Sequence, residues 1–142
     1  MKTVLDTNIF VSGLYSKRGA SYQLIKAALS GELECAVSPL LALEYEGVLH
    51  RKIEEGFLGI SEEYCGRVMD AFLAKATIAW RPIQIRPILT DPSDDKVLEC
   101  AISCECTHII TFNKRHFPAK LTELWGIQVM TAGEFLLQWR EG

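Results

Sequence analysis

Acidic residues stand at three places where this chain could do chemistry. Asp6 directly follows the apolar run 3–5, Glu44 lies in a helical pattern, and three acids occur close together in Asp91-Pro92-Ser93-Asp94-Asp95-Lys96. Carboxylate oxygens are the ligands that hard cations such as Mg²⁺ and Mn²⁺ prefer. These acids are therefore candidates for a metal site, although each also has an ordinary structural explanation.

Asp6 lies between an expected strand and an expected helix. The run Thr3-Val4-Leu5 precedes it, and Thr7-Asn8 follows where a helix is expected to begin. Its carboxylate should therefore stand at the carboxyl end of a strand. A helix N-cap at Asp6 or Asn8 explains the same residues at least as well.

Glu44 occupies a position on or beside the buried face of its helix. It stands three or four residues from Leu40, Leu41 and Val48, which belong to an apolar stripe. An ionised Glu on such a face is costly unless a cation compensates it. The alternative is a structural pair with a nearby Arg or Lys.

Helical phase separates the acids of the 91–96 segment. At about 100° per residue, the apolar face of residues 97–102 is centred within about 10° of Asp94 and about 90° from Asp95. Asp94 is therefore expected to point inward and Asp91 to start the turn before Pro92. Asp95 is expected at the helix start, favoured by the dipole or peripheral to a site. Helix capping explains the whole cluster equally simply.

A further polar group follows an expected strand at His108–Thr111. Thr111 and Asn113 would lie at the carboxyl end of that strand, and the basic tripeptide Lys114-Arg115-His116 comes just beyond. Solvated loop charge is the usual explanation for such a tripeptide. Beside an acidic pocket, it could also contact phosphates.

The elements that position these residues alternate between strand and helix patterns. Strands are predicted at Thr3–Leu5, Glu34–Val37, Ile78–Ile83, His108–Thr111 and Ile127–Met130. Helices are predicted near Asn8–Leu14, Ser21–Leu29, Pro39–Lys52, Ser61–Ala76, Ser93–Glu105 and Thr131–Arg140. This alternation predicts a three-layer α/β/α sandwich on a mainly parallel sheet, where ligands bind at the carboxyl ends of the strands.

Local capping chemistry supports three of these helix starts. Ser38-Pro39 combines an N-cap with a proline at the first helical position, and Ser61 precedes two glutamates. Thr131 and Glu134 have the spacing of a capping box.

Composition narrows the class of protein. The 142 residues, 49% apolar and 23% charged, suit one domain over 1–142. With no membrane-length apolar run and no secretory signal, we expect a soluble cytoplasmic protein. A net charge of −3 argues against coating nucleic acid by charge alone but does not exclude a nuclease.

Five cysteines are scattered through apolar stretches: Cys35, Cys65, Cys100, Cys104 and Cys106. Their odd number and irregular spacing indicate reduced thiols rather than a disulfide framework. The last three, with His108 nearby, could bind a soft metal, but their group crosses from a helix into a strand. Buried thiols that act as small hydrophobic side chains are the preferred interpretation.

Four segments in order resemble the PIN domain, particularly the VapC-like toxin ribonucleases of type II toxin–antitoxin systems. They are V-L-D-T-N-I-F at 4–10, S-P-L-L-A-L-E-Y at 38–45, D-P-S-D-D-K at 91–96 and I-I-T-F-N at 109–113. Each segment alone is a weak signal. Their order and positions at strand ends make the combination fairly specific.

The resemblance implies that Asp6, Glu44 and Asp94 are the catalytic acids that hold Mg²⁺ or Mn²⁺. The resemblance makes Thr7, Asn8 and Thr111 polar supports. From their positions along the chain, Asp95 and Asn113 are further candidate supports, and Lys114, Arg115 and His116 are candidate RNA contacts. Asn113 stands where many family members have a fourth acid, so one firmly held metal is expected and a second stays open.

The activity implied is hydrolysis of RNA to 5′-phosphate and 3′-hydroxyl ends by a metal-dependent endoribonuclease. The resemblance also implies a small antitoxin partner and a homodimer. Two alternatives remain: a nuclease-inactive RNA-binding module, and a phosphatase with Asp6 as nucleophile. The phosphatase fits less well, because Asp6-Thr7-Asn8 lacks the second acid of the common aspartate phosphatases.

Overall fold

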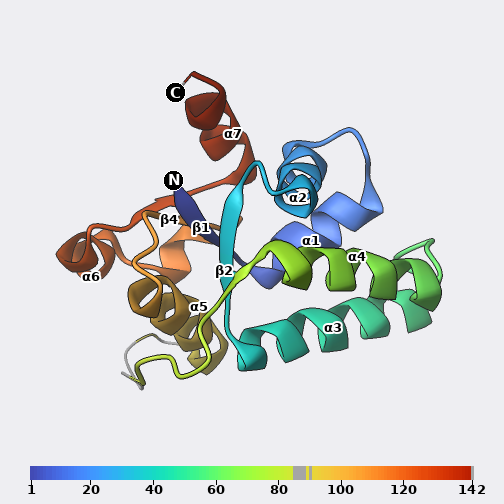
Figure 1. The fold of residues 1–142 in the computed structure, drawn as a ribbon, viewed down its shortest axis with the longest axis horizontal. Coiled ribbons are helices and arrows are strands. Elements are labelled where there is room, and N and C mark those ends of the chain that lie inside the picture. Colours follow the sequence, from blue (N-terminus) through green and yellow to red (C-terminus); the bar gives the residue numbers. More distant parts are fainter. Residues whose placement is uncertain (85–88, 90, 142) are drawn as a thin grey trace.

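A parallel sheet forms the centre of the molecule, as the computed structural model of residues 1–84, 89 and 91–141 shows (Figure 1). In that part of the chain, five strands pair in the order β3-β2-β1-β4-β5, and every pair is parallel. The strands are β1 (Lys2–Leu5), β2 (Glu34–Val37), β3 (Thr77–Ile78), β4 (His108–Ile110) and β5 (Gln128–Met130). The predicted α/β fold with a parallel central sheet is confirmed.

The central strand β1 lies between β2 and β4. Thr3 is in register with Cys35 on one side and with His108 on the other. One residue past β1, the backbone N–H of Asp6 still donates to the Ile110 carbonyl at 2.9 Å. Because parallel strands end at the same edge, Asp6 and the residues after β4 come together at the carboxyl edge of the sheet.

Helices flank the sheet. In Figure 1, α1 to α4 lie to the right of β1 and β2, and α5 and α6 lie to the left. The long helices are α1 (Thr7–Tyr15), α2 (Ala20–Ser30), α3 (Pro39–Glu54), α4 (Glu62–Lys75), α5 (Pro92–Ser103) and α7 (Ala132–Glu141). Across the described segments, none of these helices has both the length and the apolar character of a membrane span.

Three short helical turns were not predicted: η1 (Lys114–His116), α6 (Ala119–Thr122) and η2 (Glu123–Trp125). They are too short to show a helical period in the sequence.

The predicted caps are present. Ser38 Oγ accepts the N–H of Leu41 at 3.2 Å, and Ser61 Oγ accepts that of Tyr64 at 3.0 Å. Thr131 and Glu134 bond reciprocally, each side chain accepting the other's backbone N–H at 3.2 and 2.9 Å. Local side-chain chemistry therefore fixes where these helices begin.

The predicted strand at 78–83 is wrong for most of its length. Only Thr77–Ile78 form β3, and the pairing ends after the N–H of Ala79 donates to Val37 O at 2.8 Å. Trp80 is exposed. Pro82 lacks an N–H for the ladder, which is the physical reason that an apolar run here does not continue as a strand.

The core joins α1, α3 and α4 to the sheet through aromatic side chains. Tyr45 packs its ring 4.5 Å from that of Phe10 and donates its hydroxyl to the Leu5 carbonyl at 2.5 Å. Phe72 meets Phe10 edge-on at 4.9 Å between ring centroids. The hydrogen bond from Tyr45 anchors the helix that carries Glu44 to the end of β1.

The cysteines are free, as predicted, and all but the half-buried Cys104 are buried. Burial raises the pKa of the Cys35 and Cys106 thiols to about 12, so these groups stay protonated and unreactive at neutral pH.

Candidate active site

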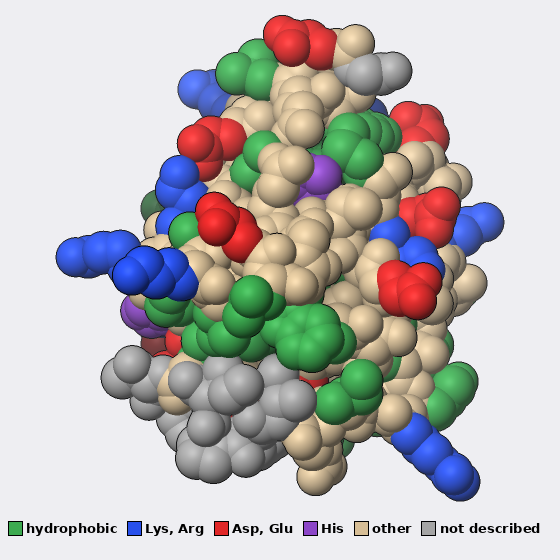
Figure 2. Space-filling view, turned by 90° about the vertical axis from the view of Figure 1, so that its left-hand side faces the viewer, with side chains coloured by type: hydrophobic (Ala, Val, Ile, Leu, Met, Phe, Trp, Pro, Cys, Tyr) green, Lys and Arg blue, Asp and Glu red, His purple; other side chains and the backbone are tan. Residues whose placement is uncertain are grey.

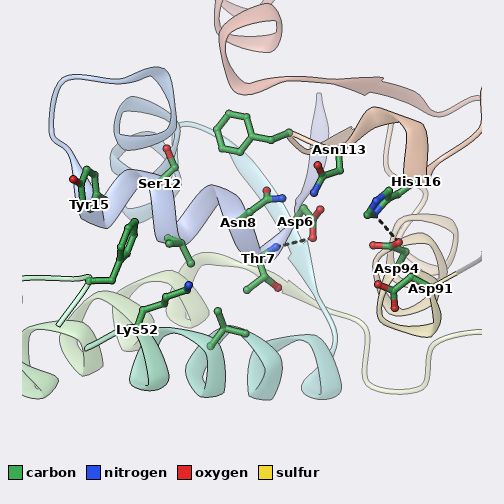
Figure 3. Close-up of a pocket in the computed structure, with 14 residues that line it drawn as sticks. Asp6, Thr7, Asn8, Ser12, Tyr15, Lys52, Asp91, Asp94, Asn113 and His116 are labelled. Atoms are coloured by element: carbon green, nitrogen blue, oxygen red, sulfur yellow. Dashed lines mark hydrogen bonds and ion pairs between the residues drawn. The ribbon is translucent and has the colours of Figure 1, made fainter. Parts of the chain in front are cut away.

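A cavity of about 570 Å³ lies at the carboxyl edge of the sheet, where β1 and β4 end (Figure 3). Its walls come from α1, α3, the start of α5 and the segment after β4. Its polar lining includes Asp6, Thr7, Asn8, Asp91, Asp94, Asn113 and His116. The structure thus brings together side chains that are up to 110 positions apart in the sequence, from Asp6 to His116.

Asp6 is buried and held by two hydrogen bonds. Its Oδ1 accepts the backbone N–H of Thr7 at 2.8 Å, and its Oδ2 accepts the hydroxyl of Thr111 at 2.7 Å. Thr111 Oγ1 also accepts the Asn113 N–H at 3.0 Å. Asp6 is therefore both the N-cap of α1 and a carboxylate fixed at the cavity. Its role as a helix cap does not exclude a role in the site.

Burial raises the pKa of Asp6, against the lowering effect of the bonds from Thr111 and Thr7. The charge of Glu44 raises it further, and that of His116 lowers it. A buried carboxylate with this balance is stabilised as an anion when a cation is placed beside it.

Asp94 faces the same cavity from the first turn of α5. The residue is 7% exposed, and its Oδ2 lies 3.0 Å from His116 Nδ1. Burial raises its pKa to about 6, opposed by His116 and reinforced by the charges of Asp6 and Asp91. The charge of Asp6 therefore acts on Asp94 across the cavity.

Glu44 is bonded to Thr7, the residue after Asp6, but it is not among the described residues that line the cavity. Its Oε2 accepts the Thr7 hydroxyl at 2.5 Å, and its Oε1 lies 3.3 Å from the Lys96 ammonium. The position beside the buried face is as predicted, and the pair with a lysine left open by the sequence is present.

The three predicted ligands do not form a ready-made metal cage. Among the residues that the structure describes, no group of three Asp, Glu, His or Cys side chains is placed to hold a metal ion. The reason is visible in the contacts: Lys96 engages Glu44, and His116 engages Asp94. Like-charged carboxylates without a cation between them are better stabilised by such partners than by one another.

The donor set nevertheless fits a hard cation. Asp6 and Asp94 offer carboxylate oxygens to one cavity, and burial together with nearby negative charge disfavours the charged form of each. Mg²⁺ is bound in proteins through one or two carboxylates plus waters and phosphate oxygens, so two acids suffice.

The burial of Asp95 contradicts the expectation drawn from helical phase. Asp95 was expected to point about 90° away from the inward face, but it is fully buried, at 0% exposure. Its Oδ1 accepts the Leu89 N–H at 3.0 Å, so it holds the chain before α5. Helix α5 contacts α3, β1, β2 and β4, and burial around most of its circumference defeats an argument based on one apolar face.

The supporting polar residues differ in their placement. Asn8 lines the cavity, and its Oδ1 is buried without a hydrogen-bond partner among the described residues. Asn113 is exposed at the rim. Both amides could contact a ligand that enters the cavity.

The basic tripeptide forms the turn η1 beside the cavity. His116 bonds Asp94, Arg115 lines a neighbouring hollow together with Asp91 and Asp94, and Lys114 pairs with Glu134 at 3.0 Å. Elsewhere, Figure 2 shows Lys and Arg side chains projecting from one face with acidic side chains between them. Positive charge near the acids therefore comes from η1, from Lys96 beside Glu44 and from Lys52 in the cavity lining.

Sequence analysis did not place Asp91 in the cavity, and it did not identify Lys96 as the partner of Glu44. Asp91 lines the cavity next to Asp94, and Lys96 neutralises Glu44. Both residues belong to the 91–96 segment already singled out, but their partners lie on other elements. The sequence gives no signal for those long-range contacts.

Comparison with known protein families matches residues 2–115 to the PIN domain, so the chain belongs to the PIN domain family. PIN domains are generally nucleases and generally use divalent metal ions. Comparison with curated proteins found no match.

Among solved structures, the chain is similar to VapBC2 from Rickettsia felis, solved bound to a DNA fragment from its promoter. The TM-score is 0.56 at 13% identity, over 91% of this chain and 97% of that chain. At this identity the likeness concerns the fold.

Proposed function

We propose that this protein is a divalent-metal-dependent endoribonuclease that hydrolyses RNA phosphodiester bonds. The observation that carries the proposal is the pair of buried carboxylates, Asp6 and Asp94, which face one cavity with their pKa values raised by burial. Membership of the PIN domain family supports the same activity.

In this proposal, Asp6 and Asp94 hold Mg²⁺ or Mn²⁺, and Glu44 acts from the side through Thr7. The cation supplies neutralisation of the phosphodiester charge and acidifies water. Thr7 and Thr111 orient the acids through the hydrogen bonds already described. Asp95 supports the start of α5, and Asn8 and Asn113 face the entering phosphate.

RNA binding would draw on η1. Arg115 and His116 stand beside the acids, while Lys114 must leave Glu134 to reach a phosphate. Close to buried acids, where water screens charge less, such charge-assisted contacts are strengthened.

The biological setting proposed is the toxin of a toxin–antitoxin pair in the cytoplasm, with a small antitoxin and a second copy of the chain as partners. The structural neighbour supports this setting, because it is a VapBC2 complex. Co-expression with the product of an adjacent reading frame, followed by size-exclusion chromatography, tests both partners. A chain that stays monomeric and captures no such product would contradict them.

The activity test compares Asp6→Asn and Asp94→Asn with Asp70→Asn, which replaces an exposed acid on α4. Cleavage of single-stranded and structured RNA is followed in Mn²⁺ and in excess EDTA, and Mn²⁺ binding is measured by calorimetry. We expect Asp70→Asn to behave as wild type, and the other two variants to lose both cleavage and Mn²⁺ binding. Equal cleavage in EDTA, or full activity in both site variants, would contradict the mechanism.

The alternative is a catalytically weak or inactive PIN-fold module that binds RNA. The specific observation in its favour is internal compensation, because Lys96 and His116 already neutralise Glu44 and Asp94. RNA binding that is indifferent to Mn²⁺ and yields no products would establish it.

A further inference from the structure

Two exposed aromatic rings form one wall of the cavity that holds the acids. Tyr15 ends α1, and Phe57 follows α3; their ring centroids are 4.7 Å apart at 21°, a stacked arrangement. They are 62% and 48% exposed. We call Tyr15, Phe57 and the adjoining Lys52 the aromatic end of the cavity.

Lys52 places a positive charge against these rings. Its Nζ lies 5.2 Å from the centroid of the Phe57 ring and 3.9 Å from Glu55, at the limit of an ion pair. The ammonium is therefore weakly held by these groups and stays inside the cavity lining. It can meet an anion without first breaking a strong bond.

The aromatic end and the acids face one continuous space. In Figure 3, Tyr15, Ser12 and Lys52 lie toward one end, Asp6 and Asn8 in the middle, and Asp94 with His116 at the other. A chain molecule lying along the cavity would therefore meet flat apolar faces at one end and carboxylates at the other.

We propose that the aromatic end is a base-binding subsite of the cavity, where one base of the RNA stacks on the open face of the Tyr15–Phe57 pair. This inference rests on the proposed function. Because the two rings already cover each other's inner faces, a base stacks on the outer face of one ring, and Lys52 meets a phosphate of the same strand. Ser12 and Asn8 offer polar groups to the base edge.

Charge favours a nucleotide over an apolar peptide as the occupant. A base stacks on the exposed rings while its own phosphate lies within reach of Lys52, whereas an apolar side chain would cover the rings and leave the ammonium desolvated without a partner. In a duplex the bases are paired and stacked inside the helix, so they cannot reach these rings without unpairing. A base-paired strand is therefore expected to bind the aromatic end more weakly than an unpaired strand.

The test measures binding separately from cleavage. Fluorescence anisotropy follows a short fluorescein-labelled single-stranded oligoribonucleotide, alone or annealed to its complement, in EDTA. The variants are Tyr15→Leu and Phe57→Leu, which keep apolar bulk but remove the ring. Tyr15→Phe keeps the ring, and Trp125→Leu removes a ring of similar exposure, 47%, away from the cavity.

We expect both leucine variants to bind the single strand roughly tenfold more weakly. Tyr15→Phe and Trp125→Leu should bind as wild type, and the annealed RNA should bind more weakly than the single strand. Thermal melting by circular dichroism confirms that each variant is folded.

Leucine variants with wild-type affinity, a duplex bound as tightly as the single strand, or no binding by the wild type would each overturn the inference. An apolar peptide that binds the cavity with wild-type affinity in both leucine variants and displaces no RNA would also overturn it. Cleavage of RNA by the wild type in Mn²⁺ tests the proposed nuclease activity separately from base binding at the aromatic end. Ring-dependent binding without any cleavage would refute the nuclease and leave the base site standing, whereas cleavage without ring dependence would do the reverse.

Discussion

The acidic end of the cavity, at Asp6 and Asp94, is buried and bonded, whereas the aromatic end, at Tyr15 and Phe57, is exposed. Hydrogen bonds from Thr7 and Thr111 fix Asp6, and contact with His116 fixes Asp94. The two rings of the aromatic end are stacked on each other and keep much of their surface open to solvent. The buried carboxylate is held in one orientation, whereas the exposed rings have room to change their side-chain conformation.

This comparison predicts different kinetic effects. Changes at the acidic end should act on the chemical step, because they alter the charge that stabilises the transition state. Changes at the aromatic end should act on affinity, because stacking is nearly equal in the bound ground state and the transition state.

The largest effect is expected from Asp94→Asn, which removes a proposed cation ligand while keeping the side-chain volume. We expect kcat for Mn²⁺-dependent RNA cleavage to fall about a thousandfold, since a bound cation supplies several kcal/mol. Single-turnover kinetics measure this, with Asp70→Asn as the matched control. A loss confined to KM would contradict the division between the two ends.

The next effect is on the pH dependence of the unfolding free energy, measured in the absence of metal ions. The pKa of Asp94 is about 6 in the folded chain against an ordinary value of 3.8, so the folded state binds the proton more tightly than the unfolded chain does. The stabilisation is complete below pH 4 and is lost as the pH rises through about 6. We expect the wild type in EDTA to gain about 1 kcal/mol in unfolding free energy from pH 7 to pH 5, relative to Asp94→Asn.

Urea unfolding at the two pH values measures that difference. The buried His108, whose pKa is lowered by burial, acts in the opposite direction below pH 6.5, but it is common to both proteins and cancels. Identical pH profiles for the two proteins would show that Asp94 is not desolvated.

An effect on cleavage smaller than that of Asp94→Asn is expected from Thr111→Val, which removes the hydroxyl that donates to Asp6 Oδ2 and accepts the Asn113 N–H. Asp6 keeps its charge but loses orientation, so cleavage should fall about tenfold. Thr111→Ser should restore it, because the hydroxyl returns. Failure of serine to rescue would point to packing rather than hydrogen bonding.

The smallest effect is expected from Lys52→Gln at the aromatic end. If Lys52 contacts one phosphate, the salt dependence of single-strand binding should fall by about 0.7 in the slope of log K against log salt. Lys26→Gln, an exposed lysine on α2 outside the cavity, is the control. Equal slopes in all three proteins would remove Lys52 from the RNA path.

Much of the fold follows from local sequence chemistry. Strand and helix periods predict the parallel sheet, and Ser38, Ser61 and Thr131 place three helix starts. Pro82 also carried the information that the run at 78–83 is mostly not a strand. The helix starts and the end of β3 depend on neighbours within a few residues, so local sequence determines them, whereas the order of the strands in the sheet depends on pairs far apart in the chain.

The positions of the candidate site residues can be predicted only partly from their neighbours in the sequence. The sequence places Asp6 at the end of a strand and Asp94 on the cavity side of its helix, since strand ends and helical phase are readable along one segment. It missed the burial of Asp95, because that depends on the elements packed around α5.

Only the tertiary structure decided how the charges are paired and what shares the cavity with them. Lys96 reaches Glu44 across 52 positions, and His116 reaches Asp94 from the other side of β4 in the sequence. The stack of Tyr15 on Phe57 likewise joins two elements whose sequences show no mutual signal. Such contacts depend on crossover connections that bring distant strand ends to one edge, and residue types alone do not encode which side chains then meet.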